Sequence, residues 1–376
     1  MRLTFLRPLY HEPGWFASVY LETSRTSPDA GKKAVPVRWR DLREELSREG
    51  ADPATLDALG EAVTDPAMSA PGAAAFGRSG SVPLAAKLAT PPLREIARWA
   101  PLPHVMPLLV QSPPRPPHLL VSANRAGGDI LAVRTIDDVL KDSVEGTGWP
   151  VHKAKVGGWS QLEHQRSTEE AWEVNAKELA AAVVSAASST KPELIVVAGD
   201  VRARGMLIDK LPSDLKAKVV VVERELDVDS PALAEAADEA LRAAADQDCR
   251  TRLETFRNQL GTGRATEGLT ETVAALRDGQ VAELFLGGDY QAGDLRLPAL
   301  TWSSARAWIG PGLADLGLTE AELRERGVTD LAEDRADAAI VRAVIGTDAE
   351  LFLVPPDEPA PSEDIGALLR YPVPLA

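Results

Sequence analysis

The sequence predicts a protein of the mixed α/β (α+β) class, built from three domains. Short apolar runs rich in Val and Ile, at residues 193–200 and 217–227, are typical of strands buried on both faces of a sheet. Helical segments rich in Ala, Leu, Glu and Arg separate such runs. The proline-rich stretch at 111–118 has the composition of a stiff, extended linker. With 376 residues, the chain is long enough for separate cores. We expect mixed sheets with flanking helices in three domains: residues 1–112, 116–227 and 229–376.

The first predicted domain combines strand patterns with a helix. Residues 13–24 are rich in aromatic and β-branched side chains and predict a strand. Residues 36–50 predict a strand that passes into a helix. A second pair of strands is expected within residues 72–88, with a turn at residues 78–80.

The second predicted domain contains a hairpin and a long helix. Two apolar runs flank a turn at residues 125–128, which is a hairpin signal. Ser160 and Glu163 have the spacing of a capping box, so the helix is expected to begin at Gln161. Apolar residues then recur at helical spacing and predict a buried stripe. The stripe comprises Trp172, Ala176, Leu179 and Val183.

A second long helix is expected to join the second and third domains. Asp229 or Ser230 can cap it, Pro231 suits its first helical position, and its body is rich in helix-forming residues. Residues 266–288 predict a helix followed by a strand, and residues 365–373 a final strand. The third domain is therefore expected to be α/β as well.

Composition excludes several classes of protein. Cys249 is the only cysteine, so an intramolecular disulfide cannot form, and the five histidines show no ligand spacing with it. We therefore expect no metal. We also expect no cofactor, because no glycine-rich dinucleotide motif is present. The first 14 residues lack the apolar core of a signal peptide, and no apolar run is long enough to span a membrane. We therefore expect a cytoplasmic monomer with no membrane partner.

The charge of the chain is unevenly distributed. The formal net charge is −15, which argues against a general nucleic-acid binder. Residues 1–110 carry 13 Lys and Arg against 12 Asp and Glu, and residues 111–228 carry 15 against 17. Residues 229–376 carry 13 against 27, so the acidity belongs almost wholly to this part. We expect the first two parts to approach RNA and the last part to face a protein, although an acidic face that only keeps the protein soluble is an open alternative.

One loop of the second domain has the composition of an RNA contact. Gly157 and Gly158 allow positive φ angles or close approach to another surface, and Trp159 beside them would expose an aromatic ring. Aromatic faces stack on bases, and lysine ammonium groups contact phosphates. The alternative is a tight connection in which Trp159 folds back into the core. The candidate contact comprises Lys153, Lys155, Gly157, Gly158, Trp159, Ser160 and Gln161.

A weaker candidate contact follows a predicted strand of the same domain. Arg202 and Arg204 come directly after residues 193–200, where guanidinium groups can contact RNA phosphates. The alternative is that both side chains simply solvate a loop.

Three stretches, taken in order, resemble a known family. They are the Gly-Gly tip at 157–158 before the long helix, "GRATEGLTETVAALRDGQVAELFL" at 263–286 and "DIGALLRY" at 364–371. Together they resemble the archaeal and eukaryotic class-one release factor and its relative Pelota, from about residue 118 to the end. The resemblance is most marked to the bacterial branch, especially its actinobacterial members and the ribosome hibernation factor Balon, where Gly-Gly-Trp-Ser-Gln openings also occur. It implies a three-domain release-factor/Pelota-like architecture.

The chain departs from the release factors at the residues that carry their activity. Release factors have Gly-Gly-Gln, whose glutamine positions water for cleavage of peptidyl-tRNA; here Trp159 stands in its place, and Gln161 comes two residues later. An indole donates one hydrogen bond and has no carbonyl oxygen with which to orient a water molecule. The first domain also lacks the Asn-Ile-Lys-Ser element that reads stop codons. We therefore expect no enzymatic activity.

The resemblance then implies a ribosome-binding factor that occupies the vacant A site and protects idle ribosomes under stress, which is ribosome hibernation. It implies that the first domain lies toward the decoding centre, the second toward the peptidyl transferase centre, and that the third contacts elongation factor Tu or another translational GTPase. Its other partner would be ribosomal RNA. Three alternatives stay open: a Pelota-like rescue adaptor, a peptidyl-tRNA ester hydrolase acting through Gln161, and an interaction protein that kept the fold and lost the ribosome.

Overall fold

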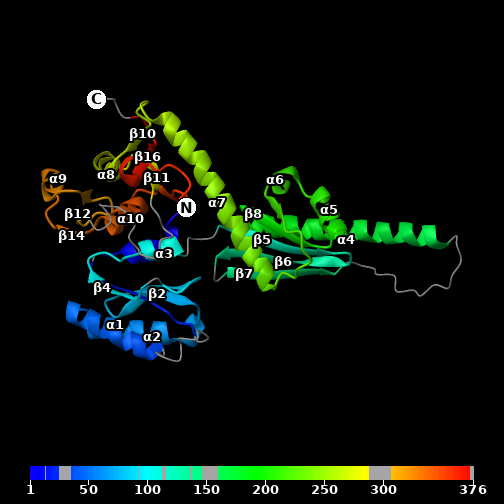
Figure 1. The fold of residues 1–376 in the computed structure, drawn as a ribbon, viewed down its shortest axis with the longest axis horizontal. Helices are drawn as coiled ribbons and strands as arrows, with labels where there is room; N and C mark the ends of the chain where they lie inside the picture. The colour runs from blue at the N-terminus through cyan, green and yellow to red at the C-terminus, as the bar shows by residue number, and fades with distance from the viewer. Residues whose placement is uncertain are drawn as a thin grey trace. The chain divides into compact units, whose positions relative to one another are not determined.

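The described chain divides into two compact units. The computed structural model describes residues 1–12, 14–24, 35–92, 94–111, 116–135, 138–145, 160–287 and 306–372, with the backbone alone at 135, 138–139, 145 and 160–169. Unit 1 comprises Met1–Pro114 together with Asp248–Ala376, and unit 2 comprises Arg115–Gln247. Both combine helices with sheets (Figure 1), so the predicted α/β class is confirmed.

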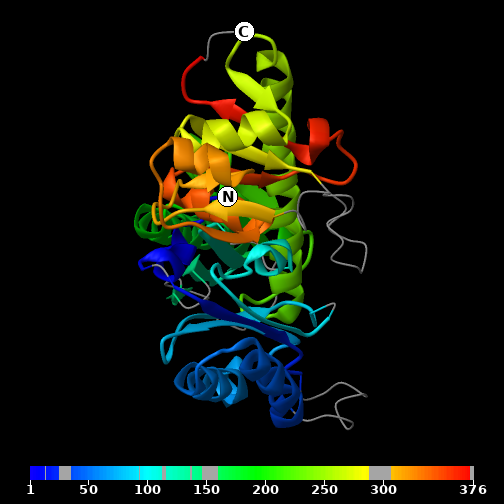
Figure 2. The ribbon, with the colours of Figure 1, turned by 90° about the vertical axis from the view of Figure 1, so that its left-hand side faces the viewer.

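The first sheet of unit 1 is antiparallel, with strand order β3-β2-β1-β4. Its strands are β1 (Phe16–Leu21), β2 (Gly72–Arg78), β3 (Ser81–Leu88) and β4 (Ile96–Ala100). Strands β2 and β3 form the expected hairpin, whose turn places Ser79 and Gly80 at positive φ, as a tight hairpin turn requires. Helices α1 (Val35–Glu49) and α2 (Pro53–Thr64) cover one face of this sheet (Figure 2).

Helix α1 corrects one prediction. Residues 36–50 were expected to pass from strand to helix, but the helix already begins at Val35. The buried residues Trp39, Leu42 and Leu46 recur at helical spacing and pack against the sheet. The β-branched valines at the start of the segment imitate a strand, but burial of this stripe favours the helix.

The C-terminal part of unit 1 holds two further sheets. One has the order β10-β16-β11-β15 and the other β13-β12-β14. The helices of this part are α8 (Leu269–Arg277), α9 (Glu320–Glu325) and α10 (Ala336–Gly346). The strands are β10 (Ala265–Glu267), β11 (Val281–Leu286), β12 (Arg306–Ile309), β13 (Leu316–Gly317), β14 (Ala332–Arg335), β15 (Glu350–Leu353) and β16 (Ile365–Leu369). The expected helix and strand within 266–288 and the final strand within 365–373 are confirmed by α8, β11 and β16.

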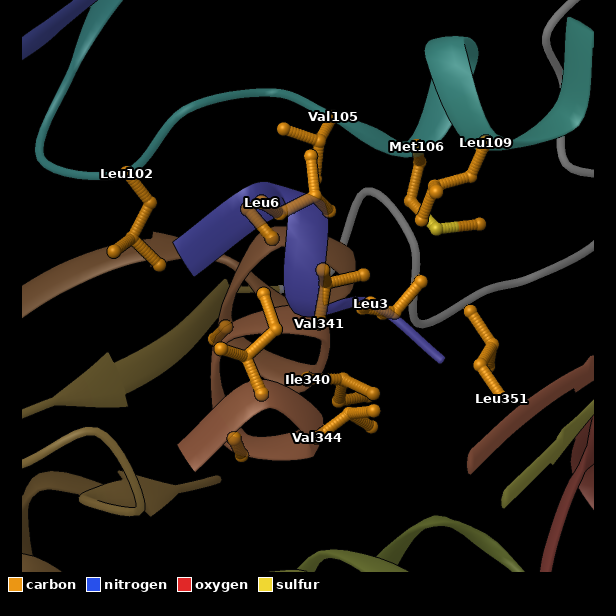
Figure 3. Close-up of a cluster of buried hydrophobic side chains, with 14 of the residues drawn as sticks. Leu3, Leu6, Leu102, Val105, Met106, Leu109, Ile340, Val341, Val344 and Leu351 are labelled. Carbon is orange, nitrogen blue, oxygen red and sulfur yellow. The ribbon is translucent and has the colours of Figure 1, made fainter. Parts of the chain in front are cut away.

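One hydrophobic core joins the N-terminal and C-terminal parts of unit 1. The 3₁₀ helix η1 (Thr4–Tyr10) lies between α10 and the segment that contains α3 (Met106–Gln111) (Figure 3). The core includes Leu6 from η1, Met106 from α3 and Val341 from α10. The first and third predicted domains therefore share a core, while each keeps its own sheets. The chain separates at residues 114–115 and 247–248, and the division into three domains stays a prediction.

Unit 2 is built on a mixed sheet with the order β7-β6-β5-β8-β9. The strands are β5 (His118–Asn124), β6 (Gly127–Thr135), β7 (Asp138–Glu145), β8 (Leu194–Gly199) and β9 (Val219–Val221). Strands β5 and β6 form the expected hairpin, while β5, β8 and β9 run parallel. Helices α4 (Ser160–Thr190) and α5 (Val201–Lys210) pack on one face of the sheet, and the short helix α6 (Ser213–Lys216) precedes β9.

Helix α7 (Pro231–Gln259) contributes to both units, as expected for the connecting helix. Pro231 is its first residue, where the missing amide proton costs nothing. Its first half supplies Leu233, Ala237 and Leu241 to the second face of the unit 2 sheet. Its second half supplies Cys249 and Phe256 to a core of unit 1. Strands β5 and β8 are accordingly buried on both faces, as their apolar sequences predict.

Candidate functional site

Helix α4 forms an arm that extends past the sheet of unit 2. Its residues pack on the sheet from Asn175 onward, and the predicted stripe is buried at Ala176, Leu179 and Val183. Figure 1 shows the N-terminal half of the helix running on beyond the strands. The helix spans 31 residues, and the 15 residues from Ser160 to Val174 correspond to about 22 Å of rise at ~1.5 Å per residue. We call residues 160–174 the arm.

The predicted loop contact precedes this arm. Lys153, Lys155, Gly157, Gly158 and Trp159 lie outside the described residues, so their role as a contact stays a prediction. The backbone of the other two residues of the predicted contact opens α4, because the helix begins at Ser160, one residue before the expected start.

The base of the arm is fastened to the end of the sheet by one arginine. Arg125, in the β5–β6 turn, places its guanidinium carbon 4.9 Å from the ring centroid of Trp172 on α4. Its Nη2 lies 3.1 Å from Oδ2 of Asp200, the N-cap of α5. The side-chain amide of Asn175 donates a 2.9 Å hydrogen bond to the carbonyl of Arg125. The hairpin turn, the arm and α5 therefore meet around one guanidinium group, which we call the arm anchor (Arg125, Trp172, Asn175 and Asp200).

Two glycines allow the backbone to converge at this edge. A Cβ on Gly199 would lie 1.9 Å from the carbonyl oxygen of Ala123, and Gly199 has a φ of +111°, which L side chains rarely adopt. A Cβ on Gly128 would lie 2.3 Å from the carbonyl oxygen of Ser122. The amide of Asp200 can therefore donate a 2.9 Å hydrogen bond to the carbonyl of Ala123. Parallel strands β5 and β8 both end here, and such an edge is where ligands commonly bind in α/β sheets.

The electrostatics of Asp200 stabilise this arrangement. Burial acts to raise the pKa of Asp200, but the amide of Ala203, the charge of Arg125 and the amide of Arg202 hold that pKa below its ordinary value of 3.8. A carboxyl group with a depressed pKa stabilises the fold fully above its ordinary pKa, and this contribution is lost as the pH falls through the lower folded value. At neutral pH, Asp200 is thus a fixed negative charge that orients Arg125.

The structure separates the two arginines of the weaker candidate contact. Arg202 is exposed in the first turn of α5 and stays a candidate for contact with phosphate. Arg204 is only 7% exposed, and its Nη1 donates a hydrogen bond to the carbonyl of Val222. The expectation that Arg204 lies at the surface is therefore wrong, because its guanidinium group connects α5 to the segment after β9.

The polar side chains of the arm anchor are engaged with one another and with the backbone. The cation of Arg125 is paired with Asp200, and the polar groups of Asn175 and Asp200 are engaged by backbone or arginine. Within the described ranges, no group of three or more His, Cys, Asp and Glu side chains could hold a metal ion. None of the helices in the same ranges combines the length and the hydropathy that a membrane-spanning segment needs. The contacts of Arg125 with Trp172, Asn175 and Asp200 hold the base of the arm against the sheet.

Replacing Asp200 with alanine is expected to lower the free energy of unfolding of unit 2 by about 1–2 kcal/mol. The carboxylate caps α5 through the amides of Arg202 and Ala203, and loss of an N-cap typically costs about this much. Hydrogen exchange of peptides from α5 and α4 would measure the change. Asp209→Ala, on the exposed face of the same helix, is the matched control and should change stability by less than about 0.5 kcal/mol. Equal losses of stability in Asp200→Ala and Asp209→Ala would contradict the capping role of Asp200.

Comparison with known proteins gives three kinds of similarity. Residues 117–262 match the sequence model of bacterial archaeo-eukaryotic release factor family 2. An uncharacterized protein of Mycobacterium tuberculosis strain H37Rv is 29% identical over 379 residues, covering 99% of this chain and 97% of the relative. Among solved structures, the archaeal translation termination factor aRF1 is 17% identical over 97% of this chain and 95% of its own, with a TM-score of 0.24. Archaeoglobus fulgidus Pelota is 14% identical over 80% of this chain and 79% of its own, with a TM-score of 0.35.

Proposed function

We propose that this chain, a release-factor/Pelota-like protein of the bacterial branch, is a ribosome-associated factor that occupies the vacant A site without catalysing a reaction. The family resemblance expected from the sequence is confirmed by the match over residues 117–262, which contain the arm and the arm anchor. In the proposal, the arm carries the loop with Gly157, Gly158 and Trp159 toward the peptidyl transferase centre. The bound chain then keeps the A site filled and protects the idle ribosome, as in hibernation.

The observation that carries the proposal is the tryptophan in the loop before the arm. Trp159 stands where a release factor has its water-positioning glutamine. Gln161 comes two residues later, and its backbone belongs to the first turn of α4, so we do not expect it to take the place of that glutamine. An indole presents a stacking face and one hydrogen-bond donor, but no acceptor for orienting water. A tip of this composition is suited to binding RNA and not to cleaving an ester.

The charge distribution supports an orientation with the acidic part away from RNA. Residues 229–376 carry 13 Lys and Arg against 27 Asp and Glu, whereas residues 1–110 carry 13 against 12. Like charge repels the phosphate backbone, so the last part is better suited to a protein partner. Elongation factor Tu or another translational GTPase is the partner class that we propose for this part.

Trp159→Ala is expected to weaken binding to vacant ribosomes by about 5- to 150-fold, because stacking of one base on an aromatic side chain contributes ~1–3 kcal/mol. Co-sedimentation of the full chain with purified 70S ribosomes measures this affinity. Phe5→Ala, which removes an aromatic ring that is 37% exposed on η1, is the matched control and should bind like the wild type. If the wild type does not co-sediment, even with elongation factor Tu present, the proposed function is wrong.

Two further measurements distinguish the proposed function from two alternatives. A Pelota-like rescue adaptor would split 70S ribosomes into subunits when a GTPase is supplied, which a sucrose gradient reveals. A peptidyl-tRNA hydrolase would release labelled peptide from stalled complexes, and Gln161→Ala would abolish that release. We expect intact 70S ribosomes and no released peptide.

A further inference from the structure

Two tryptophans, Trp15 exposed and Trp99 partly buried, form an aromatic pair at one edge of a sheet of unit 1. Trp15 immediately precedes β1, and Trp99 lies in β4, the edge strand that pairs with β1. Ala17 is opposite Trp99 in the register, so Trp15, two residues before Ala17, lies on the same face of the sheet. The ring centroids of the two tryptophans are 6.0 Å apart, with an angle of 32° between the planes. We call these two residues the tryptophan pair.

The inner member of the tryptophan pair is held in place by the fold. Trp99 packs against the core formed by the sheet, α1 and α2. Its backbone amide donates a 2.7 Å hydrogen bond to the carboxylate of Glu49, the last residue of α1. Gly50 follows with a φ of +100°, and a Cβ built there would lie 4.0 Å from Nε1 of the Trp99 indole. Trp99 is thus a fixed support at the end of α1.

The outer member of the pair is not explained by packing. The Trp15 residue is 52% exposed, so much of its apolar surface contributes no burial energy in the folded chain. Tryptophan is enriched at binding sites because it offers a large, rigid surface at low entropic cost. An indole that rests on a fixed support and leaves ring surface open is suited to stacking with another planar group.

The net charge of this part of the chain does not oppose RNA as the source of that planar group. The tryptophan pair lies within residues 1–110, the part of the chain with no acidic excess. Arg48 is exposed in the last turn of α1, two residues before Gly50, and an exposed guanidinium group can contact an RNA phosphate. Single-stranded RNA presents both groups together, an unstacked base and a flanking phosphate.

We propose that Trp15, supported by Trp99, stacks an unpaired base of single-stranded RNA. This inference rests on the proposed function in that a ribosome supplies such bases in its ribosomal RNA and in messenger RNA. It adds a second RNA contact in unit 1, independent of the loop before the arm.

The test compares two substitutions of Trp15 in the full chain. Trp15→Ala removes the stacking face and is expected to weaken binding of a fluorescein-labelled single-stranded RNA 12-mer about tenfold. Trp15→Phe keeps an aromatic face and should lose less than about threefold. Phe5→Ala is the control for loss of an exposed ring elsewhere in unit 1, and circular dichroism checks that each variant is folded. Fluorescence anisotropy measures the RNA affinity, and co-sedimentation measures ribosome binding in parallel.

The two readouts separate the inference from the proposed function. RNA binding that is lost in Trp15→Ala and kept in Trp15→Phe supports stacking, even if the chain does not co-sediment with ribosomes and the proposed function fails. Wild-type binding to the 12-mer that Trp15→Ala leaves unchanged, or no wild-type binding at all, overturns stacking whatever the ribosome result. Weaker ribosome binding in Trp15→Ala with unchanged RNA affinity assigns the tryptophan pair to a protein partner and also overturns it.

Discussion

Arg98→Ala is expected to lower the free energy of unfolding of unit 1 by about 3–5 kcal/mol, the largest effect of any single change considered for this fold. Asp334 is completely buried, and its carboxylate pairs with the guanidinium of Arg98, which is 21% exposed. The amides of Leu102 and Arg335 also donate to this carboxylate, at 2.8 and 2.7 Å. Without Arg98, the buried negative charge loses its cation and keeps only these amides.

The buried pair also connects the two sequence segments of unit 1. Arg98 belongs to β4 and Asp334 to β14, 236 residues later, so the loss should destabilise both sides of the shared core. Hydrogen exchange of peptides from β4 and α10 measures the opening free energy on each side. Arg94→Ala, which removes an exposed arginine four residues away, is the matched control. A change below about 1 kcal/mol in Arg98→Ala would show that the pair is dispensable.

Acidification is expected to destabilise unit 1 by about 3 kcal/mol through one buried histidine. Burial lowers the pKa of His104 from 6.5 to about 4; nearby Asp337 acts to raise that pKa, and three arginines act to lower it further. The arginines are Arg94, Arg98 and Arg335. The unfolded chain therefore binds a proton more readily than the folded chain between these two pH values. Stability due to neutral His104 is complete above about pH 6.5 and is lost as the pH falls toward 4.

The His104→Phe variant tests this pH dependence. The ring of His104 packs edge-on to Tyr20, with centroids 6.5 Å apart, and a phenyl ring can keep that contact without titrating. The backbone of residue 104 still accepts a 2.6 Å hydrogen bond from the Tyr20 hydroxyl. Hydrogen exchange of α3 and β4 peptides at pH 7 and pH 4.5 gives the loss of opening free energy on acidification. This loss should be about 2 kcal/mol smaller in His104→Phe than in the wild type. His11→Phe, at an exposed position, should keep the wild-type pH dependence, and equal behaviour of the two variants would contradict the role of His104.

Local signals in the sequence predicted most of the secondary structure. Some features depend only on residues that are neighbours in the sequence, and these could be predicted. They include the turns at residues 78–80 and 125–128 and the proline that begins α7. The strand predicted at the start of residues 36–50 was wrong, because β-branched residues there favour a strand locally. The burial that favours a helix depends on the sheet against which α1 packs. Local propensity was outweighed there by tertiary packing.

The long-range features could not be predicted from the sequence. The pairing of Arg98 with Asp334 and the packing of η1 against α10 join segments more than 200 residues apart, and no local pattern marks them. Burial of Arg204 depends on the position of Val222 across the sheet edge. The shared core of unit 1 is therefore a property of the folded chain alone.

The sequence pointed to the loop before the arm, whose role stays a prediction, and the arm anchor at the base of the arm was not predicted. The composition of residues 153–161 predicts an RNA contact, and a tight connection with Trp159 folded into the core is the alternative. The arm anchor joins Arg125, Asn175 and Asp200, which are 50 or more residues from at least one partner. One signal was available: Asp200 follows an apolar run and precedes a helix, which is the position of an N-cap.

Competition with A-site tRNA tests the central claim most directly. Vacant 70S ribosomes would be incubated with the full chain, with or without deacylated tRNA prebound in the A site, and the bound chain measured after sedimentation. Occupancy of the A site predicts that prebound tRNA abolishes binding of the wild type, with Phe5→Ala behaving in the same way. Undiminished binding to ribosomes with a filled A site would contradict the account and place the chain elsewhere on the ribosome.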